Sequence, residues 1–403
     1  MWESKIDIRQ VFELRCRTLV YFGAGAIEKI SDISDYLKNH GINKVLIISD
    51  ETVLKVTGVW EIIEPVFKQK GISYELYTGV VPNPTVDNID TAVKMGKDHG
   101  SQAVIGIGGG SPIDVAKSVA VLLKNTDKTA RELYELTFEP DQAVPIIAIN
   151  TTHGTGTEVD RFAVASIPEK NYKPAIAYDC IYPLFAIDDP MLMLKLPPNQ
   201  TRYVSVDAVN HITEAATSLA TSPYTILTAQ ETVRLVAKYL PQAIDNPEDL
   251  TARYYLLYAS AIAGICFDNG LLHFTHAMEH PLSAIKPELP HGLGLAMLLP
   301  AVVKQIYPAV PEILAAIYQP IVPGLKGIAA ESGQCAAGIE EWLFSVGIKS
   351  KLQDEGYSKQ DVDTLTNLVL TTPSLDTLLS VAPIEATEQT IRSIYEDSFK
   401  TIK

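Results

Sequence analysis

Short runs of β-forming residues alternate with longer helical patterns over the first half of the chain, and each run ends in a polar or glycine-rich loop. This alternation predicts an α/β fold in which helices cover a parallel sheet. In an open parallel sheet the ligand lies outside the carboxyl ends of the strands, so the loops after these runs are the candidate binding loops. The expected strands are Lys44–Ser49, Ile72–Tyr77, Ala103–Ile107 and Val144–Ile149.

The second half of the chain has a different pattern, with long segments rich in Ala, Leu, Ile and Val at helical spacing after about Pro190. A chain of 403 residues also exceeds one hydrophobic core, which stops growing at about 250–300 residues. We therefore predict an α/β domain over residues 1–190 and an all-α domain over residues 191–403. The expected helices are Arg202–Ala220, Ser222–Tyr239, Ala252–Glu279, Pro311–Ile317 and Cys335–Val346.

Three prolines, Pro281, Pro287 and Pro290, follow the third of these expected helices. Because proline cannot continue the backbone hydrogen bonds of a helix, the helix is expected to end near Glu279 and a loop to carry the chain to His291.

Two loops after expected strands are suited to a phosphate group. In the first, Gly108, Gly109, Gly110 and Ser111 precede a helical run that starts at Asp114, so backbone N–H groups and a helix N-terminus can face an anion. The second loop offers the small hydroxyl residues Thr151, Thr152 and Thr155, which can contact ribose and pyrophosphate. The alternatives are a tight strand-to-helix turn for the first loop and a capped turn for the second.

Asp50 stands at the end of the first expected strand. Its carboxylate can accept hydrogen bonds from a ribose diol and would repel a 2′-phosphate, which favours NAD over NADP. The alternative role for a strand-terminal aspartate is the N-cap of the next helix.

Five of the eight histidines lie between residues 211 and 291. Asp207 and His211 are four residues apart in a helical stretch, so both side chains project from one face and can bind one cation. His276 and His280 repeat this spacing, and His291 follows on the expected loop. A carboxylate with several imidazoles suits Fe²⁺, Zn²⁺ or Mn²⁺, although spacing alone does not choose between His276 and His280. The alternative is a set of hydrogen-bonded core histidines.

Taken together, the motifs resemble the iron-dependent, or group III, alcohol dehydrogenases of the dehydroquinate synthase-like superfamily. The resemblance covers nearly the whole chain. The matching segments are Phe22–Ala26 (FGAGA), Pro82–Thr85 (PNPT), Gly108–Lys117 (GGGSPIDVAK), Thr151–Val159 (TTHGTGTEV), Asp207 with His211, His276–His280 (HAMEH) and Pro290–Gly292 (PHG).

The resemblance implies a Rossmann-like NAD-binding domain, a helical metal-binding domain and a cleft between them. It further implies residue roles. His280 would relay a proton, and Lys173 would lie beside the cofactor, with a solvated surface charge as its alternative. The implied metal ligands are Asp207, His211, His276 and His291, and the implied apolar pocket residues are Phe162, Phe267 and Leu272.

Three positions depart from the family pattern. His153 stands where the family usually has alanine, Asp160–Arg161 replaces a common uncharged pair, and His273 adds an imidazole one helical turn before His276.

The function implied is hydride transfer between a small alcohol or aldehyde and NAD, with Fe²⁺ bound or Zn²⁺ or Mn²⁺ in its place. One alternative is a zinc polyol dehydrogenase of the glycerol type. Another is a dehydroquinate synthase-like lyase, whose anionic substrate needs Lys or Arg. Residues 204–220 and 261–284 contain neither, although Arg161 leaves a small acidic substrate possible. A non-enzymatic scaffold or filament-forming module is the third alternative.

Charge and cysteine usage bear on partners and location. A formal net charge of −15 repels nucleic acid and anionic membranes, so neither is expected as a partner. The four cysteines form no CxxC pair, the first ten residues lack a secretory signal pattern, and no apolar run is long enough to span a bilayer. We therefore expect a cytoplasmic protein, present as a homodimer or larger homo-oligomer.

Overall fold

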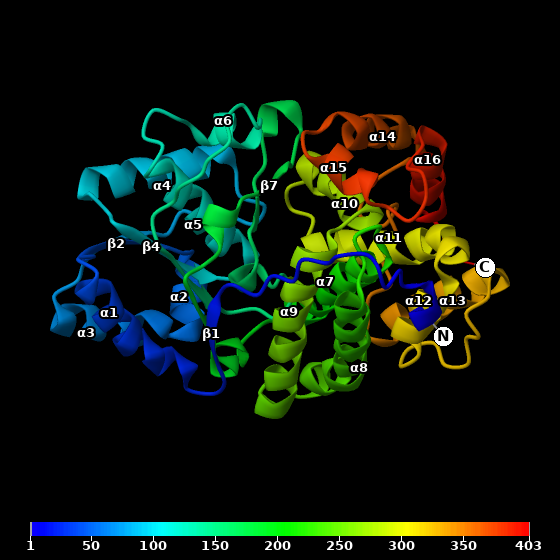
Figure 1. The fold of residues 1–403 in the computed structure, drawn as a ribbon, viewed down its shortest axis with the longest axis horizontal. Helices are drawn as coiled ribbons and strands as arrows, with labels where there is room; N and C mark the ends of the chain where they lie inside the picture. The colour runs from blue at the N-terminus through cyan, green and yellow to red at the C-terminus, as the bar shows by residue number, and fades with distance from the viewer. Residues whose placement is uncertain (1, 403) are drawn as a thin grey trace.

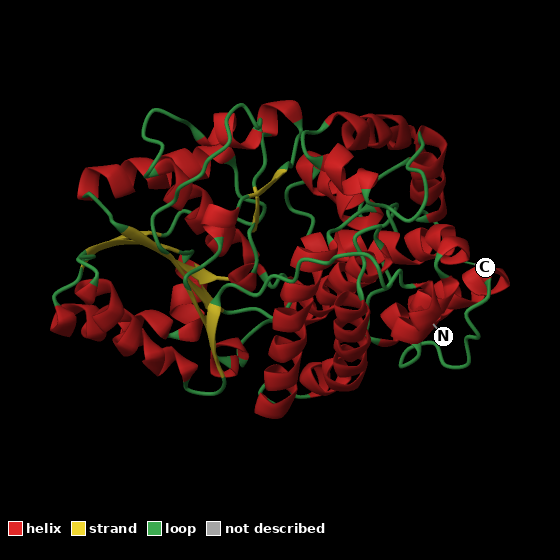
Figure 2. Cartoon of the chain, in the orientation of Figure 1, coloured by secondary structure: helices red, strands yellow, loops and turns green. Residues whose placement is uncertain are grey.

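The computed structural model describes residues 2–402 and has two halves. All strands lie in one half, where helices flank a twisted sheet, and the other half is helical (Figures 1 and 2). The predicted fold class is confirmed: an α/β N-terminal domain is followed by an all-α C-terminal domain.

The sheet has six parallel strands in the order β1-β8-β5-β4-β2-β3. The four predicted strands are present with shifts of one or two residues at their ends, and β1 and β8 were not predicted. Both are only four residues long, which is too short for a clear alternation of buried and exposed positions. The strands are β1 (Leu19–Phe22), β2 (Lys44–Ile48), β3 (Ser73–Tyr77), β4 (Ala103–Gly108), β5 (Ile146–Asn150) and β8 (Phe185–Asp188).

Helices cover both faces of this sheet because its strands are apolar on both sides. On β2, Leu46 and Ile48 pack in the core beneath α4, α5 and α6, whereas Val45 and Ile47 pack on the opposite side with α1 and α3. The helices of this half are α1 (Ile30–Asn39), α2 (Glu51–Thr57), α3 (Val59–Lys70), α4 (Val86–His99), α5 (Gly110–Leu122) and α6 (Ala130–Tyr134). A separate antiparallel pair, β6 (Phe162–Val164) and β7 (Ala175–Ala177), lies toward the helical half (Figure 1).

The helical half surrounds one large apolar core to which α7, α8, α9 and α11 contribute most. The helices are α7 (Pro198–Thr217), α8 (Pro223–Asp245), α9 (Leu250–Gly270), α10 (Phe274–Ile285), α11 (His291–Ile306), α12 (Pro311–Tyr318), α13 (Ser332–Ser345), α14 (Val362–Thr371), α15 (Leu375–Ser380) and α16 (Glu388–Asp397).

The single helix predicted over residues 252–279 is wrong, because the chain breaks into α9 and α10. Leu271 has φ of +63°, which ends α9. Gly270 packs so closely on α7 that a Cβ there would lie 2.5 Å from the carbonyl oxygen of Ala215. The break therefore depends on a tertiary contact that helical periodicity does not record.

The prediction that a helix ends near Glu279 and that His291 lies on a loop is also wrong. α10 continues through Pro281 to Ile285, because one proline removes only one backbone hydrogen bond from a helix packed on its neighbours. His291 is the first residue of α11, directly after Pro290. The first turn of α11 therefore fixes the position of its side chain.

The first residues of the chain lie on the helical half. Trp2 and Ile6 pack against its core, and the Arg15 backbone exchanges hydrogen bonds of 2.6 and 2.9 Å with the Asn269 side chain. Figure 1 shows this segment crossing in front of α9 and α7 before it enters the sheet as β1.

By length and composition alone, α9 and the segment His291–Ala309 could each cross a membrane. Their apolar windows are 61% and 78% buried inside the protein, as expected for core helices. This differs from the expectation from the sequence, in which no apolar run is long enough to span a bilayer.

Candidate active site

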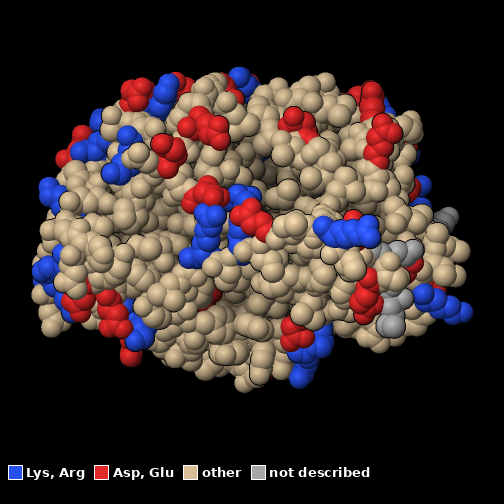
Figure 3. Space-filling model, viewed as in Figure 1, with Lys and Arg blue, Asp and Glu red and all other residues tan. Residues whose placement is uncertain are grey.

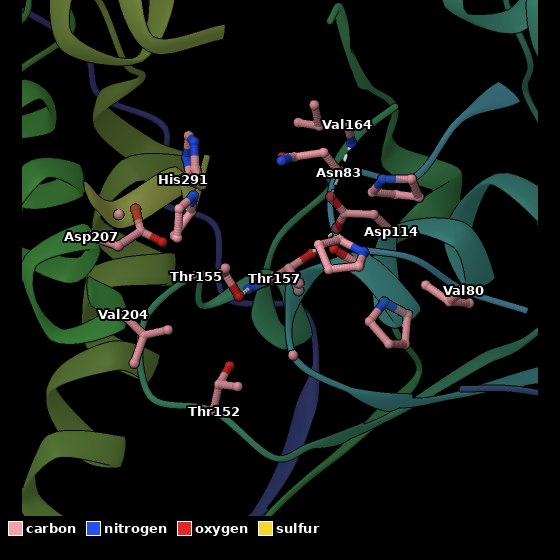
Figure 4. A pocket seen from close by; sticks show the side chains of 18 of the residues that line it. Val80, Asn83, Asp114, Thr152, Thr155, Thr157, Val164, Val204, Asp207 and His291 are labelled. Carbon is pink, nitrogen blue, oxygen red and sulfur yellow. Dashed lines mark hydrogen bonds between the residues drawn. The ribbon is translucent and has the colours of Figure 1, made fainter. Parts of the chain in front are cut away.

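One cavity of about 1090 Å³ extends between the two halves. The loops after β2, β4 and β5 line one end, and α7, α10 and the start of α11 line the other. In Figure 3 the surface is hollowed between the halves, with charged residues gathered beside the hollow. Figure 4 shows Asp207 and His291 across the cavity from Asp114, with Thr155 and Thr157 between them.

Four predicted ligand residues meet at the helical end of this cavity. Asp207 and His211 lie one turn apart on α7, with Nε2 of His211 3.5 Å from Oδ1 of Asp207. Nε2 of His276 lies 3.6 Å from the same oxygen. Ligand atoms of Asp207, His276 and His291 all lie within 4.8 Å of one another. The His211 ring stacks on that of His276, with centroids 4.6 Å apart.

The donor atoms of this cluster fit a divalent metal. Among the described residues, Oδ1 of Asp207 and Nε2 of His276 are buried and have no hydrogen-bond partner, an arrangement that is costly unless another group binds them. Although burial acts to raise the pKa of Asp207, the nearby His211 and the other imidazoles lower it to about 2, so the carboxylate is ionised. One carboxylate with imidazoles suits Fe²⁺ or Zn²⁺.

Glu214 supports this cluster and was missed by the sequence analysis. It is fully buried on α7, and one of its oxygens accepts a hydrogen bond from Nδ1 of His276. The other oxygen accepts from the backbone N–H groups at the start of α10, including Thr275 at 2.6 Å. Burial acts to raise the pKa of Glu214, but His276 lowers it to about 2. The signal was its spacing of seven residues from Asp207, which places both on one face of a helix.

Glu279, the second missed carboxylate, joins the two halves. It is fully buried, binds Nδ1 of His291 and lies 3.5 Å from Nζ of Lys173. Lys173 also donates to Asn83 at 2.9 Å and to Ser283 at 2.8 Å. Lys173 is therefore buried at the cavity, and the alternative of a solvated surface charge is wrong.

His280 lines the same cavity but has a different partner. Its Nδ1 donates to the backbone oxygen of Lys173 at 2.8 Å, which leaves Nε2 as the unprotonated nitrogen. Burial, together with the nearby Lys173, holds the pKa of His280 well below its ordinary value. The ring is thus neutral, with Nε2 as its acceptor nitrogen.

The glycine and threonine loops form the other end of the cavity. The start of α5 lines it with Gly109, Gly110 and Ser111, and the loop after β5 lines it with Thr151, Thr152 and Thr155. Gly108, at the end of β4, is not among the lining residues. The loops touch, since a Cβ on Gly109 would lie 2.8 Å from Thr152.

Two predicted cofactor residues already have protein partners. Asp114 accepts from Thr157 at 2.8 Å and from the Val164 backbone at 3.0 Å, so it braces the threonine loop and β6. Burial raises the pKa of Asp114 to about 6. Asp50 lines the cavity and caps α2, because Oδ1 accepts from Val53 N at 2.8 Å.

The predicted apolar pocket residues lie together near the ligand cluster. Phe162, Phe267 and Leu272 all line the cavity, with the two phenyl centroids 5.3 Å apart. The Phe267 ring also stacks on His211 at 4.5 Å. The cavity is thus apolar directly beside its cluster of imidazoles.

Arg161 and His273, which belong to two of the departures from the family pattern, do not line the cavity, whereas Asp160 does. Arg161 forms ion pairs with Asp179 at 2.9 Å and with Asp268 at 3.4 Å. Its guanidinium is therefore not free to bind an acidic substrate. His273 is fully buried, accepts from Phe274 N at 2.8 Å and contacts Thr217 at 2.9 Å. It therefore caps α10 and adds no ligand to the cluster.

The chain matches two family profiles in succession. Residues 18–190 match the iron-containing alcohol dehydrogenase profile, and residues 201–399 match the C-terminal profile of the same family.

Individual relatives agree with these profiles. The chain is 64% identical to "Long-chain primary alcohol dehydrogenase AdhA" of Thermoanaerobacter ethanolicus, over 99% of this chain and 100% of that protein. It is 32% identical to "Alcohol dehydrogenase 4" of Schizosaccharomyces pombe, over 94% and 86% of the two chains. The solved structure of NADH-dependent butanol dehydrogenase A from Thermotoga maritima has a TM-score of 0.87 and 28% identity, covering 97% of this chain and 99% of that one.

These matches favour neither a lyase nor a non-enzymatic scaffold. Both profiles, a curated relative along the full length and the cavity with its metal-type donor set point to one conclusion: the chain belongs to the iron-containing alcohol dehydrogenase family and is an oxidoreductase acting on an alcohol or aldehyde.

Proposed function

We propose that this enzyme transfers a hydride between a primary alcohol with an alkyl chain and NAD, using a divalent iron held by Asp207, His211, His276 and His291. The observation that carries the proposal is the shared cavity, which has phosphate-type loops at one end and buried, unpaired ligand atoms at the other. Both reactants can therefore lie next to each other in one space.

The protein positions its ligand atoms through buried carboxylates. Glu214 binds Nδ1 of His276 and Glu279 binds Nδ1 of His291, so each imidazole is held with Nε2 free for the metal. Bound iron would supply a Lewis acid that polarises the substrate oxygen. His280, one turn from His276, is placed to accept the proton released from the alcohol at its Nε2.

The cofactor is proposed to lie along the glycine and threonine loops. The N-terminus of α5 at Gly110 and Ser111 would face the pyrophosphate, and the hydroxyls of Thr151, Thr152 and Thr155 would contact pyrophosphate and ribose. Asp50 would accept from the adenosine ribose. Lys173 lies at the same cavity but directs its ammonium toward Glu279 and Asn83, so its role would be to hold the two halves together beside the cofactor.

The substrate end favours an alkyl chain. Phe162, Phe267 and Leu272 offer apolar contacts next to the ligand cluster, and the relative with 64% identity is named for long-chain primary alcohols. A zinc polyol dehydrogenase would need polar groups for several hydroxyls at this place. We further propose that the enzyme is cytoplasmic and works as a homodimer or larger homo-oligomer.

A substrate panel on protein of measured metal content tests the proposal. Protein purified without oxygen is expected to contain iron and to reduce NAD with primary alcohols. The kcat/KM should rise about fourfold per methylene until the pocket is filled, since each buried CH₂ contributes about 0.8 kcal/mol. Activity confined to zinc-loaded protein with glycerol would replace the proposal by the polyol function, and no NADH formation with any alcohol would end it.

A further inference from the structure

The threonine loop divides its side chains between two environments. Thr151, Thr152 and Thr155 line the cavity, whereas His153, between them, is 1% exposed and lies against the helical half. His153 is also a position at which this chain departs from the usual alanine of the family.

His153 forms a buried pair with Arg253 of α9. Nη1 of Arg253 donates to Nε2 of His153 at 2.9 Å, and Nδ1 of His153 lies 3.2 Å from Oγ of Ser205 on α7. Because a guanidinium can only donate, Nε2 is the acceptor and Nδ1 carries the hydrogen that faces Ser205. Burial and the charge of Arg253 lower the pKa of His153 to about 3, so the ring stays neutral.

Arg253 is a buried cation without a carboxylate partner among the described residues. It is fully buried, and burial lowers its pKa to about 10, so it remains charged at neutral pH. Its other hydrogen bonds go to Thr201 Oγ1 at 2.8 Å, the Pro247 carbonyl at 3.0 Å and the Leu196 carbonyl at 3.4 Å. A buried charge is costly unless its donors are satisfied, so the acceptor nitrogen of His153 matters to the site.

The loop backbone is in direct contact with the same two helices. A Cβ on Gly154 would lie 2.4 Å from the carbonyl oxygen of Val204, one turn before Asp207 on α7. Gly156 has φ of +65°, and a Cβ there would lie 2.5 Å from Cα of Gly264 on α9. At these two glycines the loop backbone packs directly on the helices, with no side chain between them. A change in the Arg253–His153 pair would therefore displace the loop backbone itself.

We propose that the Arg253–His153 pair positions the threonine loop and thereby sets the affinity for the dinucleotide, while the hydride-transfer step is left largely unchanged. Both residues act through Thr151, Thr152 and Thr155 and lie outside the cavity. The inference rests on the proposed function in one respect, namely that the cavity side of this loop holds the cofactor.

Titration of NADH fluorescence against iron-loaded protein tests the proposal in His153→Ala and His153→Gln. The alanine variant is expected to bind NADH about tenfold more weakly, the effect of losing one hydrogen bond to a charged group, with kcat within about twofold and iron content unchanged. The glutamine variant keeps an acceptor for Arg253 and is expected to recover most of the affinity. Ser205→Ala, a milder change, should weaken binding about two- to threefold.

Three results would overturn this inference. The first is NADH affinity of His153→Ala within twofold of the parent. The second is that the alanine and glutamine variants lose NADH affinity, iron content and thermal stability to the same extent, which would indicate a purely structural role. The third applies if His153→Ala does not fold: it is an NADH affinity of Ser205→Ala equal to that of the parent. A parent protein that binds no NADH would instead overturn the proposed function, and this inference with it.

Discussion

Two histidines one turn apart on α10 differ in the partner of Nδ1. His276 has the Glu214 carboxylate, whereas His280 has a backbone carbonyl. A carboxylate partner makes the opposite nitrogen a stronger metal ligand, and it fixes the orientation of the ring. The residue environment thus distinguishes the proposed metal ligand His276 from the proposed proton acceptor His280, which sequence spacing could not do.

This difference predicts opposite outcomes for two alanine variants. His276→Ala should lose both iron and activity, whereas His280→Ala should retain iron and lose about 100-fold or more in kcat, the usual contribution of a general base. Elemental analysis and steady-state kinetics of both purified proteins check the prediction. Full iron retention in His276→Ala would be incompatible with its role as a ligand.

Replacing Asp50 is expected to change the choice between NAD and NADP without changing the stability of the protein. Asp50→Asn keeps an N-cap side chain for α2 but removes the charge that would repel a 2′-phosphate. The ratio of kcat/KM for NAD to that for NADP should fall about tenfold or more, with little change in the thermal midpoint. Measuring both cofactors at one ionic strength provides the test, and an unchanged ratio would count against a ribose contact.

At the scale of elements, helix α9 lies directly on the threonine loop at Gly264. A Cβ on Gly264 would lie 2.5 Å from the Gly156 carbonyl oxygen, so Gly264→Ala should separate helix and loop and destabilise the protein by about 1–3 kcal/mol. Gly333→Ala on α13 is the matched control, because a Cβ there meets nothing within 4 Å. Thermal unfolding checks the pair: equal midpoints would show that the contact is not tight.

How far the sequence predicts these elements depends on whether their cause is local. The strands β2 to β5 and the helix with Asp207 and His211 follow from runs of apolar residues and their spacing. The break between α9 and α10 and the helix start at His291 depend on packing between distant segments, which spacing does not contain. Glu279 was missed for the same reason, since its role is recognised only from the imidazole it contacts, whereas Glu214 lies seven residues after Asp207 and could have been found from that spacing.

At the scale of the whole molecule, buried carboxyl groups near the sheet predict how stability varies with pH. Burial raises the pKa of Asp188, at the end of β8, to about 7, and its Oδ2 has no hydrogen-bond partner among the described residues. In the unfolded chain the pKa of an aspartate is about 3.9. As pH rises above that value the unfolded state ionises first, so this group contributes less stability at pH 8 than at pH 5.

Asp188→Asn should therefore stabilise the protein more at pH 8 than at pH 5. The added difference is expected to be on the order of 1 kcal/mol, or about 2 °C in the thermal midpoint. Calorimetry of the parent and variant at both pH values makes the comparison, with Asp245→Asn at an exposed position as the matched control. A larger stabilisation by Asp188→Asn at pH 5 than at pH 8 would contradict this prediction.

Both ends of the described chain are fixed to the helical half: Trp2 packs against its core, and Ile402 N donates to Glu340 at 3.0 Å. The α/β half is therefore topologically an insertion, attached by one crossing before β1 and another between β8 and α7. Because two covalent crossings join the halves, rotation about the line between these crossings is the relative motion that disturbs the backbone least. Opening of the cleft to admit and release NAD is therefore expected to follow that rotation.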